Sequence, residues 1–204
     1  MLRLENICKS FGEQTVLRNV NLTLPENGIL RLDGPSGVGK TTLLGIMAGI
    51  VSPDSGRLIG FDTTRCACAF QDDRLLPWFS VLANVALVCS EDKARRMLAA
   101  MELGDALDKR PGQLSGGMRK RVNLARALCA EADYVLLDEP LQGLDRKLRA
   151  EVIQPLIAER AKSAPVVLVT HNVFDEEAEN YCRNSVDMAV INGYSSEIIL
   201  RNDK

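Results

Sequence analysis

A glycine-rich segment near the N-terminus has the residue types and the spacing of a phosphate-binding loop. It consists of Gly34, Pro35, Ser36, Gly37, Val38, Gly39, Lys40 and Thr41. An apolar strand is expected before it and a helix after it, which is the context that such a loop requires. Glycines let backbone N–H groups curl around a β-phosphate, while the helix N-terminus and Lys40 bring positive charge to the phosphate oxygens. A plain glycine turn is the alternative, which the Gly-Lys-Thr sequence at this spacing disfavours.

Two adjacent carboxylates, Asp138 and Glu139, follow the apolar run at residues 134–137. A carboxylate at such a strand end can bind Mg²⁺, mostly through water, and the Thr41 hydroxyl is a second candidate ligand. We expect this strand to lie beside the strand that precedes the phosphate loop, so that Glu139 faces the γ-phosphate. An Asp-Glu pair at a strand end is most often a solvated turn, but the apolar run and the phosphate loop favour the metal site.

A second glycine turn occurs at Ser115, Gly116 and Gly117, where a helix over residues 118–129 is expected to begin. Ser115 can cap this helix, and the two glycines leave backbone N–H groups bare, so the turn is a second candidate phosphate site. An ordinary capped helix is the alternative.

These segments together resemble one family. The stretch Leu114-Ser115-Gly116-Gly117-Met118-Arg119-Lys120-Arg121, followed by residues 134–140, resembles the ATP-binding cassette (ABC) ATPases, the motor subunits of ABC transporters. The resemblance runs along nearly the whole chain, although Met118 stands where the family usually has Gln. It implies a P-loop NTPase fold of the α/β class, with a mostly parallel core sheet, an antiparallel β lobe and a helical lobe. It also implies ATP hydrolysis, with ATP and Mg²⁺ bound.

The resemblance gives individual residues their expected roles. Glu139 matches the glutamate that polarises the attacking water, and His171 matches the histidine that hydrogen-bonds the γ-phosphate and positions Glu139. Gln71 matches the hinge glutamine that reaches Mg²⁺ or the water, and Phe11 matches the aromatic residue that stacks on adenine. A structural histidine, a surface glutamine and a core phenylalanine are the simpler alternatives. The implied nucleotide site comprises Phe11, residues 34–41, Thr42, Gln71, Ser115, Gly116, Gly117 and Asp145, and the implied Mg²⁺ ligands are Thr41, Gln71 and Asp138.

The two phosphate sites imply a pair of subunits. We expect the turn at Ser115 to lie far from Lys40 in the same chain, so both cannot hold one ATP. In the resembled family two subunits pair head to tail, and each ATP lies between the loop of one subunit and the turn of the other. The resemblance therefore implies a homodimer with ATP at its interface, and Asp145 matches a loop that crosses this interface.

A segment after Gln71 narrows the resemblance. Residues 74–85, which contain Leu-Leu-Pro-Trp, resemble a segment of importer subunits for nitrate, sulfonate and taurine. There the segment borders the groove that takes a helix of the membrane subunit. The resemblance thus implies transmembrane permease subunits and a separate solute-binding protein as partners. Trp78 and Phe79 are the expected anchors, and core packing is the alternative for both.

Composition limits the other partners. The net charge is −2 and no long basic run occurs, which argues against nucleic acid as a partner. The longest apolar run, residues 43–51, is too short to span a bilayer, and the N-terminus has no apolar signal core. We therefore expect a cytoplasmic protein that lies on the inner face of the cell membrane through its partners. The six cysteines form no Cys-x-x-Cys pair, and only Cys66 and Cys68 are expected to point the same way.

The elements that position these residues follow from hydrophobic periodicity. Strands are expected at residues 2–8, 16–24, 29–33, 57–61, 66–70, 134–137 and 166–169, and helices at 40–48, 81–89, 91–103, 118–129 and 145–162. Residues 186–200 suggest a hairpin. The pattern predicts one nucleotide-binding domain over residues 1–204, with its core and β lobe at about 1–70 and 131–204 and its helical lobe at about 72–130.

Three other functions share parts of this pattern. A lipid or lipoprotein exporter ATPase would carry the same catalytic residues and differ in its membrane partner. A soluble ABC ATPase that acts on ribosomes or DNA usually fuses two cassettes or carries basic or coiled-coil insertions, which this chain lacks. A nucleotide-gated scaffold without turnover is disfavoured because Glu139 and His171 are both present.

Overall fold

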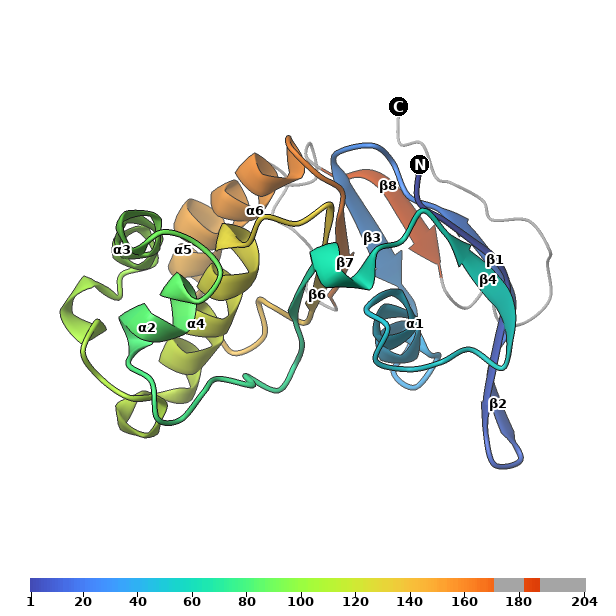
Figure 1. Ribbon diagram of the computed structural model, residues 1–204, viewed down its shortest axis with the longest axis horizontal. Helices are drawn as coiled ribbons and strands as arrows, with labels where there is room; N and C mark the ends of the chain where they lie inside the picture. The colour runs from blue at the N-terminus through green and yellow to red at the C-terminus, as the bar shows by residue number, and fades with distance from the viewer. Residues whose placement is uncertain (171–181, 188–204) are drawn as a thin grey trace.

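The structure is a computed structural model, and it describes residues 1–170 and 182–187. Figure 1 shows three parts in a row: a group of helices at one end, a parallel sheet with helix α1 in the middle, and an antiparallel sheet at the other end. This α/β arrangement of a parallel sheet, an antiparallel sheet and a helical group confirms the predicted fold class. No helix in the described ranges is long and apolar enough to cross a membrane.

The central sheet is parallel and has the strand order β5-β6-β7-β3-β8. Its strands are β3 (Ile29–Asp33), β5 (Cys66–Ala69), β6 (Tyr134–Asp138), β7 (Val166–Val169) and β8 (Cys182–Asp187). Strand β7 lies between β6 and β3, so the prediction that the strand ending at Asp138 lies beside the loop strand is wrong. Periodicity identifies buried strands but not their order, because every strand in the sheet interior carries the same apolar pattern.

Alternate side chains of the central strands build two cores, one on each face of the sheet. Val135 and Leu137 of β6 join the core shared with the helical group, while Leu136 joins the core shared with α1 and the antiparallel sheet. Tyr134 also lies in this second core, where its hydroxyl donates to the backbone oxygen of Met47 at 2.9 Å. The helical group and the antiparallel sheet with α1 therefore each pack against one face of the central sheet.

The antiparallel sheet has the order β2-β1-β4, with β1 (Arg3–Phe11), β2 (Gln14–Thr23) and β4 (Ser55–Ile59). Strands β1 and β2 form a hairpin in which Phe11 pairs with Gln14. The first strand is longer than predicted because register shifts interrupt its apolar alternation, one of them beside Asn6, whose φ is 52°. The second and fourth strands begin two residues earlier than predicted, and β2 also ends one residue and β4 two residues earlier.

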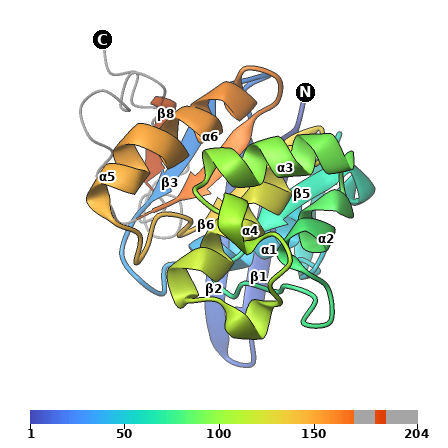
Figure 2. The same ribbon diagram turned by 90° about the vertical axis from the view of Figure 1, so that its left-hand side faces the viewer.

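Serine residues begin the helices of the helical group, which Figure 2 shows face-on. Ser80, Ser90 and Ser115 each accept a hydrogen bond from a backbone N–H of the first turn. The helices are α2 (Val81–Ala86), α3 (Glu91–Ala100) and α4 (Gly116–Cys129). Helices α2 and α3 end three residues earlier than predicted, and the chain after α3 turns at Glu102, whose φ is 56°.

The remaining helical segments are distributed along the chain. Helix α1 (Lys40–Met47) follows the glycine loop, and short 3₁₀ turns occur at Thr63–Arg65, Gly104–Ala106 and Pro111–Gln113. The helix predicted for residues 145–162 consists of α5 (Arg146–Leu148), a π-helical turn (Arg149–Ile153) and α6 (Gln154–Ala161). Pro155 explains the widened turn, because proline has no N–H to donate. The predicted hairpin lies mostly outside the described residues, and its first two residues continue β8 instead.

Candidate nucleotide-binding site

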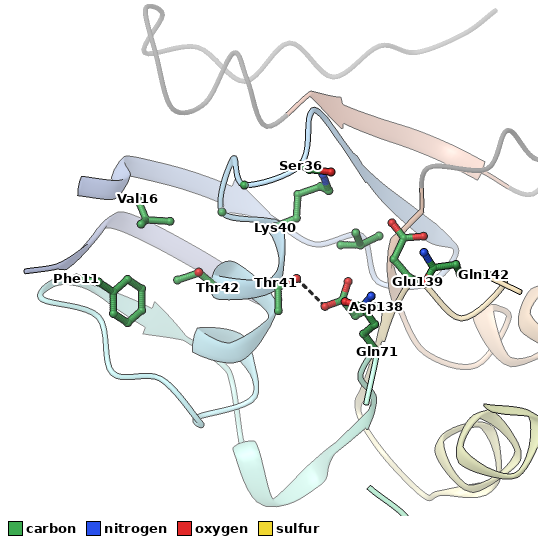
Figure 3. A pocket seen from close by; sticks show the side chains of 13 residues that line it. Phe11, Val16, Ser36, Lys40, Thr41, Thr42, Gln71, Asp138, Glu139 and Gln142 are labelled. Atoms are coloured by element: carbon green, nitrogen blue, oxygen red, sulfur yellow. Dashed lines mark hydrogen bonds between the residues drawn. The ribbon is translucent and has the colours of Figure 1, made fainter. Parts of the chain in front are cut away.

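One open pocket of about 400 Å³ gathers most of the residues that the sequence singled out (Figure 3). Ten of them line it: Phe11, Ser36, Gly37, Gly39, Lys40, Thr41, Thr42, Gln71, Asp138 and Glu139. They come from β1, the glycine loop, α1 and the ends of β5 and β6. In a parallel sheet, such a position at the carboxyl ends of the strands is where ligands usually bind.

The glycine loop needs glycine for its conformation. Gly37 and Gly39 have φ values of 80° and 105°, in the region that other residues rarely adopt. A Cβ atom on Gly39 would lie 2.8 Å from Cδ2 of Leu17 and 3.2 Å from the backbone oxygen of Val16. The loop therefore passes close under the antiparallel sheet, and helix α1 begins at Gly39 without a side-chain cap. Its first N–H groups point toward the loop.

Lys40 brings a positive charge into the centre of this loop. Its ammonium group donates to the backbone oxygens of Gly34 at 2.6 Å and Pro35 at 2.9 Å, and the residue is only 6% exposed. The loop thus wraps around the cation. An ammonium group, the N-terminus of α1 and glycine N–H groups together form a strongly anion-binding concavity.

Side-chain oxygen atoms of Thr41, Asp138 and Gln71 line another part of the pocket. The Thr41 hydroxyl donates to Oδ2 of Asp138 at 2.7 Å, although the two residues are 97 positions apart in the sequence. Gln71 lies beside Asp138 in the close view of the pocket. A hydroxyl, a carboxylate and an amide oxygen are the hard donors that Mg²⁺ prefers, and Mg²⁺ commonly takes only one or two carboxylates with phosphate and water. The residues present therefore fit a Mg²⁺ ion.

Glu139 occupies an unusual backbone position. Its φ is 51°, in the left-handed region that costs a non-glycine residue free energy. Its N–H donates to the backbone oxygen of Val169 at 2.9 Å, which ties it to the end of β7, and the residue is 8% exposed. This geometry places a carboxylate on the pocket wall directly after Asp138. Backbone strain of this kind is typical of functional sites.

Phe11 lies at the other end of the pocket, on the turn between β1 and β2. Its side chain is 53% exposed, which excludes the alternative that it is a core residue. The Lys9 ammonium group lies 5.4 Å from the ring centroid of Phe11 and makes a cation–π contact with one face of this ring.

The pocket does not gather every predicted residue. Gly34, Pro35 and Val38 belong to the loop but do not line the pocket, and neither does the turn Ser115–Gly117 nor Asp145. Ser115 caps α4, and Asp145 caps α5 by accepting from the N–H groups of Lys147 and Leu148. His171 lies outside the described residues. Two separate parts of one chain thus carry the two candidate phosphate sites, as the sequence suggested.

Three pocket residues were not predicted: Val16, Gln142 and Val169. Val169 ends the apolar strand β7, and Val16 lies in β2, the second strand of the hairpin. Their sequence pattern indicated strands and gave no sign of a role in binding. Gln142 lies three residues after Glu139. Its position shortly after the two carboxylates was the one feature of the sequence that could have placed it in the pocket.

The fold and this site together define a P-loop ATPase, and comparison with known proteins gives its family. The family model described as ABC transporter matches residues 17–142. The chain is 41% identical over 196 residues to the taurine import ATP-binding protein TauB of Pseudomonas entomophila, covering 87% of this chain and 75% of the relative. It is 40% identical over 188 residues to the aliphatic sulfonates import ATP-binding protein SsuB 2 of Pseudomonas aeruginosa, covering 87% and 68%.

A comparison with solved structures points to the same family. The dimeric ATP-binding cassette MJ0796 in a post-hydrolysis state with ADP and Pi superimposes with a TM-score of 0.80 at 29% identity, covering 92% of this chain and 94% of that one. The chain therefore belongs to the ABC transporter family. The family and the relatives confirm ATP binding and ATP hydrolysis in the service of transport, and they do not favour the exporter alternative.

Proposed function

We propose that this chain is the ATP-hydrolysing subunit of an importer and that the pocket of Figure 3 holds ATP with Mg²⁺. The observation that carries the proposal is the convergence of Lys40, Thr41, Gln71, Asp138 and Glu139 on one pocket. Phosphate-binding and metal-binding groups meet there with a carboxylate on the wall.

Each wall of the pocket has a part in binding. The N–H groups of residues 34–41 and the Lys40 ammonium hold the phosphates, and Thr42 extends this contact from the first turn of α1. The exposed face of the Phe11 ring stacks on adenine, because aromatic faces bind flat bases. Thr41, Gln71 and Asp138 would hold Mg²⁺, and the ion would supply positive charge that offsets the charge of the phosphates.

Glu139 acts on the attacking water. Its carboxylate accepts a hydrogen bond from the water and orients it toward the γ-phosphorus atom, and the strained backbone holds it at the wall. His171, which follows β7 by two residues, is proposed from the family resemblance to contact the γ-phosphate and to orient Glu139. Val169, at the end of that strand, lines the same pocket.

A second copy of the chain completes each site. The turn at Ser115, Gly116 and Gly117 is mostly exposed and lies outside the pocket, yet it begins a 14-residue helix with bare N–H groups. We assign it to the γ-phosphate of an ATP held by the partner subunit, and Asp145 to the contact between the two sites. The dimeric cassette among the similar structures supports this arrangement.

Transmembrane subunits are the second partner. Trp78 is 65% exposed, which excludes the core alternative for this residue, while Phe79 is half-buried against it with ring centroids 6.5 Å apart. We propose that this apolar surface takes a cytoplasmic helix of the permease, that residues 72–130 move as a lobe, and that the subunit works on the inner face of the membrane. A separate solute-binding protein would deliver the solute.

The relatives named for taurine and aliphatic sulfonates make these compounds the first solutes to test. The chain itself has no need to touch the solute.

The experiment replaces the proposed water-orienting carboxylate. Glu139→Gln keeps the shape and removes the charge, so the purified subunit should bind ATP normally and hydrolyse it roughly 10²- to 10⁴-fold more slowly. Glu131→Gln, at an exposed position, is the matched control and should hydrolyse ATP at the normal rate. Turnover by Glu139→Gln close to that of the control would refute the assignment.

A further inference from the structure

Asn84 is a polar side chain in the middle of an apolar core. It lies on α2 and is 0% exposed, between Val81 and Val85, which are also fully buried. Burying an amide costs free energy unless its polar atoms find hydrogen-bond partners. Asparagine is also a poor helix former compared with the apolar residues that would fit here. Its presence therefore calls for a reason outside the helix.

The hydrogen bonds of Asn84 supply that reason, because all of them go to the loop before α2. Its Oδ1 accepts from the N–H of Leu76 at 2.9 Å, and its Nδ2 donates to the backbone oxygens of Leu76 at 3.1 Å and Ser80 at 3.0 Å. A longer contact reaches the backbone oxygen of Phe79 at 3.3 Å. One side chain thus holds both ends of the segment 76–80.

The segment held in this way displays the tryptophan. The N–H of Phe79 donates to the backbone oxygen of Leu76 at 3.2 Å, which closes a turn with Pro77 and Trp78 at its tip. Ser80 then caps α2 by accepting from the N–H of Ala83 at 3.1 Å. Leu76 and Phe79 are half-buried on either side, while Trp78 projects into solvent. Within residues 1–170 and 182–187, Asn84 is the one side chain that hydrogen-bonds to the backbone of this turn.

We propose that Asn84 is a positioning residue that fixes the turn at residues 76–80 in the shape that presents Trp78 to the membrane subunit. This inference rests on the proposed docking role of Trp78. A turn already fixed in its bound shape loses less conformational entropy when the partner binds, and affinity is gained in this way without a new contact. Asn84 itself is buried and touches no partner.

The test uses Trp78 as its own probe, because it is the only tryptophan of the chain. Asn84→Ala removes the bonds to the turn, so Trp78 should show lower fluorescence anisotropy and faster quenching by acrylamide. Assembly with the transporter's own membrane subunits in nanodiscs should weaken roughly 3- to 10-fold. Asn84→Asp keeps the volume and the acceptor and loses both donors, and it replaces Asn84→Ala if that variant does not fold.

Val85→Ala is the matched control. Val85 is the next residue of the same helix and is equally buried, and its aliphatic side chain cannot hydrogen-bond to the turn. Both variants should lower the melting temperature, but only the Asn84 variant should change the Trp78 signals and the assembly. Equal Trp78 anisotropy and equal assembly in the two variants would overturn the inference.

Trp78→Ala separates this inference from the docking role on which it rests. If Trp78→Ala assembles as well as the wild type, the docking role is wrong, and the functional part of the inference falls with it. If Trp78→Ala assembles poorly while Asn84→Ala leaves anisotropy and assembly unchanged, docking stands and the positioning role of Asn84 is refuted.

Discussion

Cys66 and Cys68 lie on the same side of β5, with their sulfur atoms 3.4 Å apart, as their alternation in the strand predicted. The hydrogen bond between them raises the pKa of Cys66, and burial raises it further. The same bond lowers the pKa of Cys68, and the nearby charge of Arg74 adds to this effect. The two thiols therefore differ in reactivity, because the thiolate is the reactive form.

The expected outcome is that iodoacetamide modifies Cys68 well before Cys66. A lowered pKa means that Cys68 is already a thiolate at a pH where an ordinary thiol is protonated, so its rate profile should lie at lower pH. Cys66→Ala removes the hydrogen-bond donor and should move this profile to higher pH. Fragment-ion mass spectrometry across a pH series resolves the two positions. Equal modification of both thiols, or an unmoved profile in Cys66→Ala, contradicts the geometry.

At the scale of single residues, the sequence identified most polar residues that line the pocket, and it missed the apolar residues of its wall. Lys40, Thr41, Asp138 and Glu139 were identifiable because local spacing defines a loop and a strand end. The hydrogen bond between Thr41 and Asp138 joins elements 97 residues apart, which no local pattern encodes. Val16 and Val169 were missed for a similar reason, since a pocket wall is made by tertiary packing rather than by residue type.

Among the elements, helix α4 carries the clearest link between local structure and the proposed chemistry. Ser115 caps it by accepting from the N–H of Met118 at 3.2 Å, and Ser90 caps α3 in the same way through the N–H of Lys93 at 3.4 Å. Of the two serines, only Ser115 was predicted as a helix cap. The C-terminal ends of α2 and α3 were not predicted correctly, because the turns that end these helices depend on contacts within the helical group.

These two caps make a matched pair of variants. Ser115→Ala and Ser90→Ala should each lower the free energy of unfolding by about 0.5–2 kcal/mol, measured by denaturant titration. Only Ser115→Ala should also reduce ATP turnover, by about 10- to 100-fold, because a hydrogen bond to a charged phosphate is lost. Equal turnover in the two variants would show that Ser115 only caps α4, and it would contradict the proposed phosphate contact.

The order of the strands in the central sheet could not be predicted from the sequence. The apolar runs that became β6 and β7 were found, yet β6 was placed beside β3, and the structure puts β7 between them. Buried parallel strands share the same composition, so their order is decided by crossovers and packing. The functional conclusion survived because Asp138 and the loop still meet at the carboxyl ends of the strands.

For the whole molecule, the central feature is that one chain carries two separated turns for which we propose phosphate binding. The pocket beside Lys40 contains no residue of the turn Ser115–Gly117, although both turns begin helices. A pair of chains arranged head to tail would bring each turn to the other's pocket. Pairing is thus the part of the account on which catalysis, the role of Asp145 and coupling to a permease all depend.

Light scattering on Glu139→Gln with and without ATP and Mg²⁺ tests this pairing most directly, since slow hydrolysis preserves the ATP-bound state. Saturating ATP should convert the monomer to a dimer, and Ser115→Ala in the same background should weaken this conversion. A species that stays strictly monomeric under saturating ATP at high protein concentration would contradict the account.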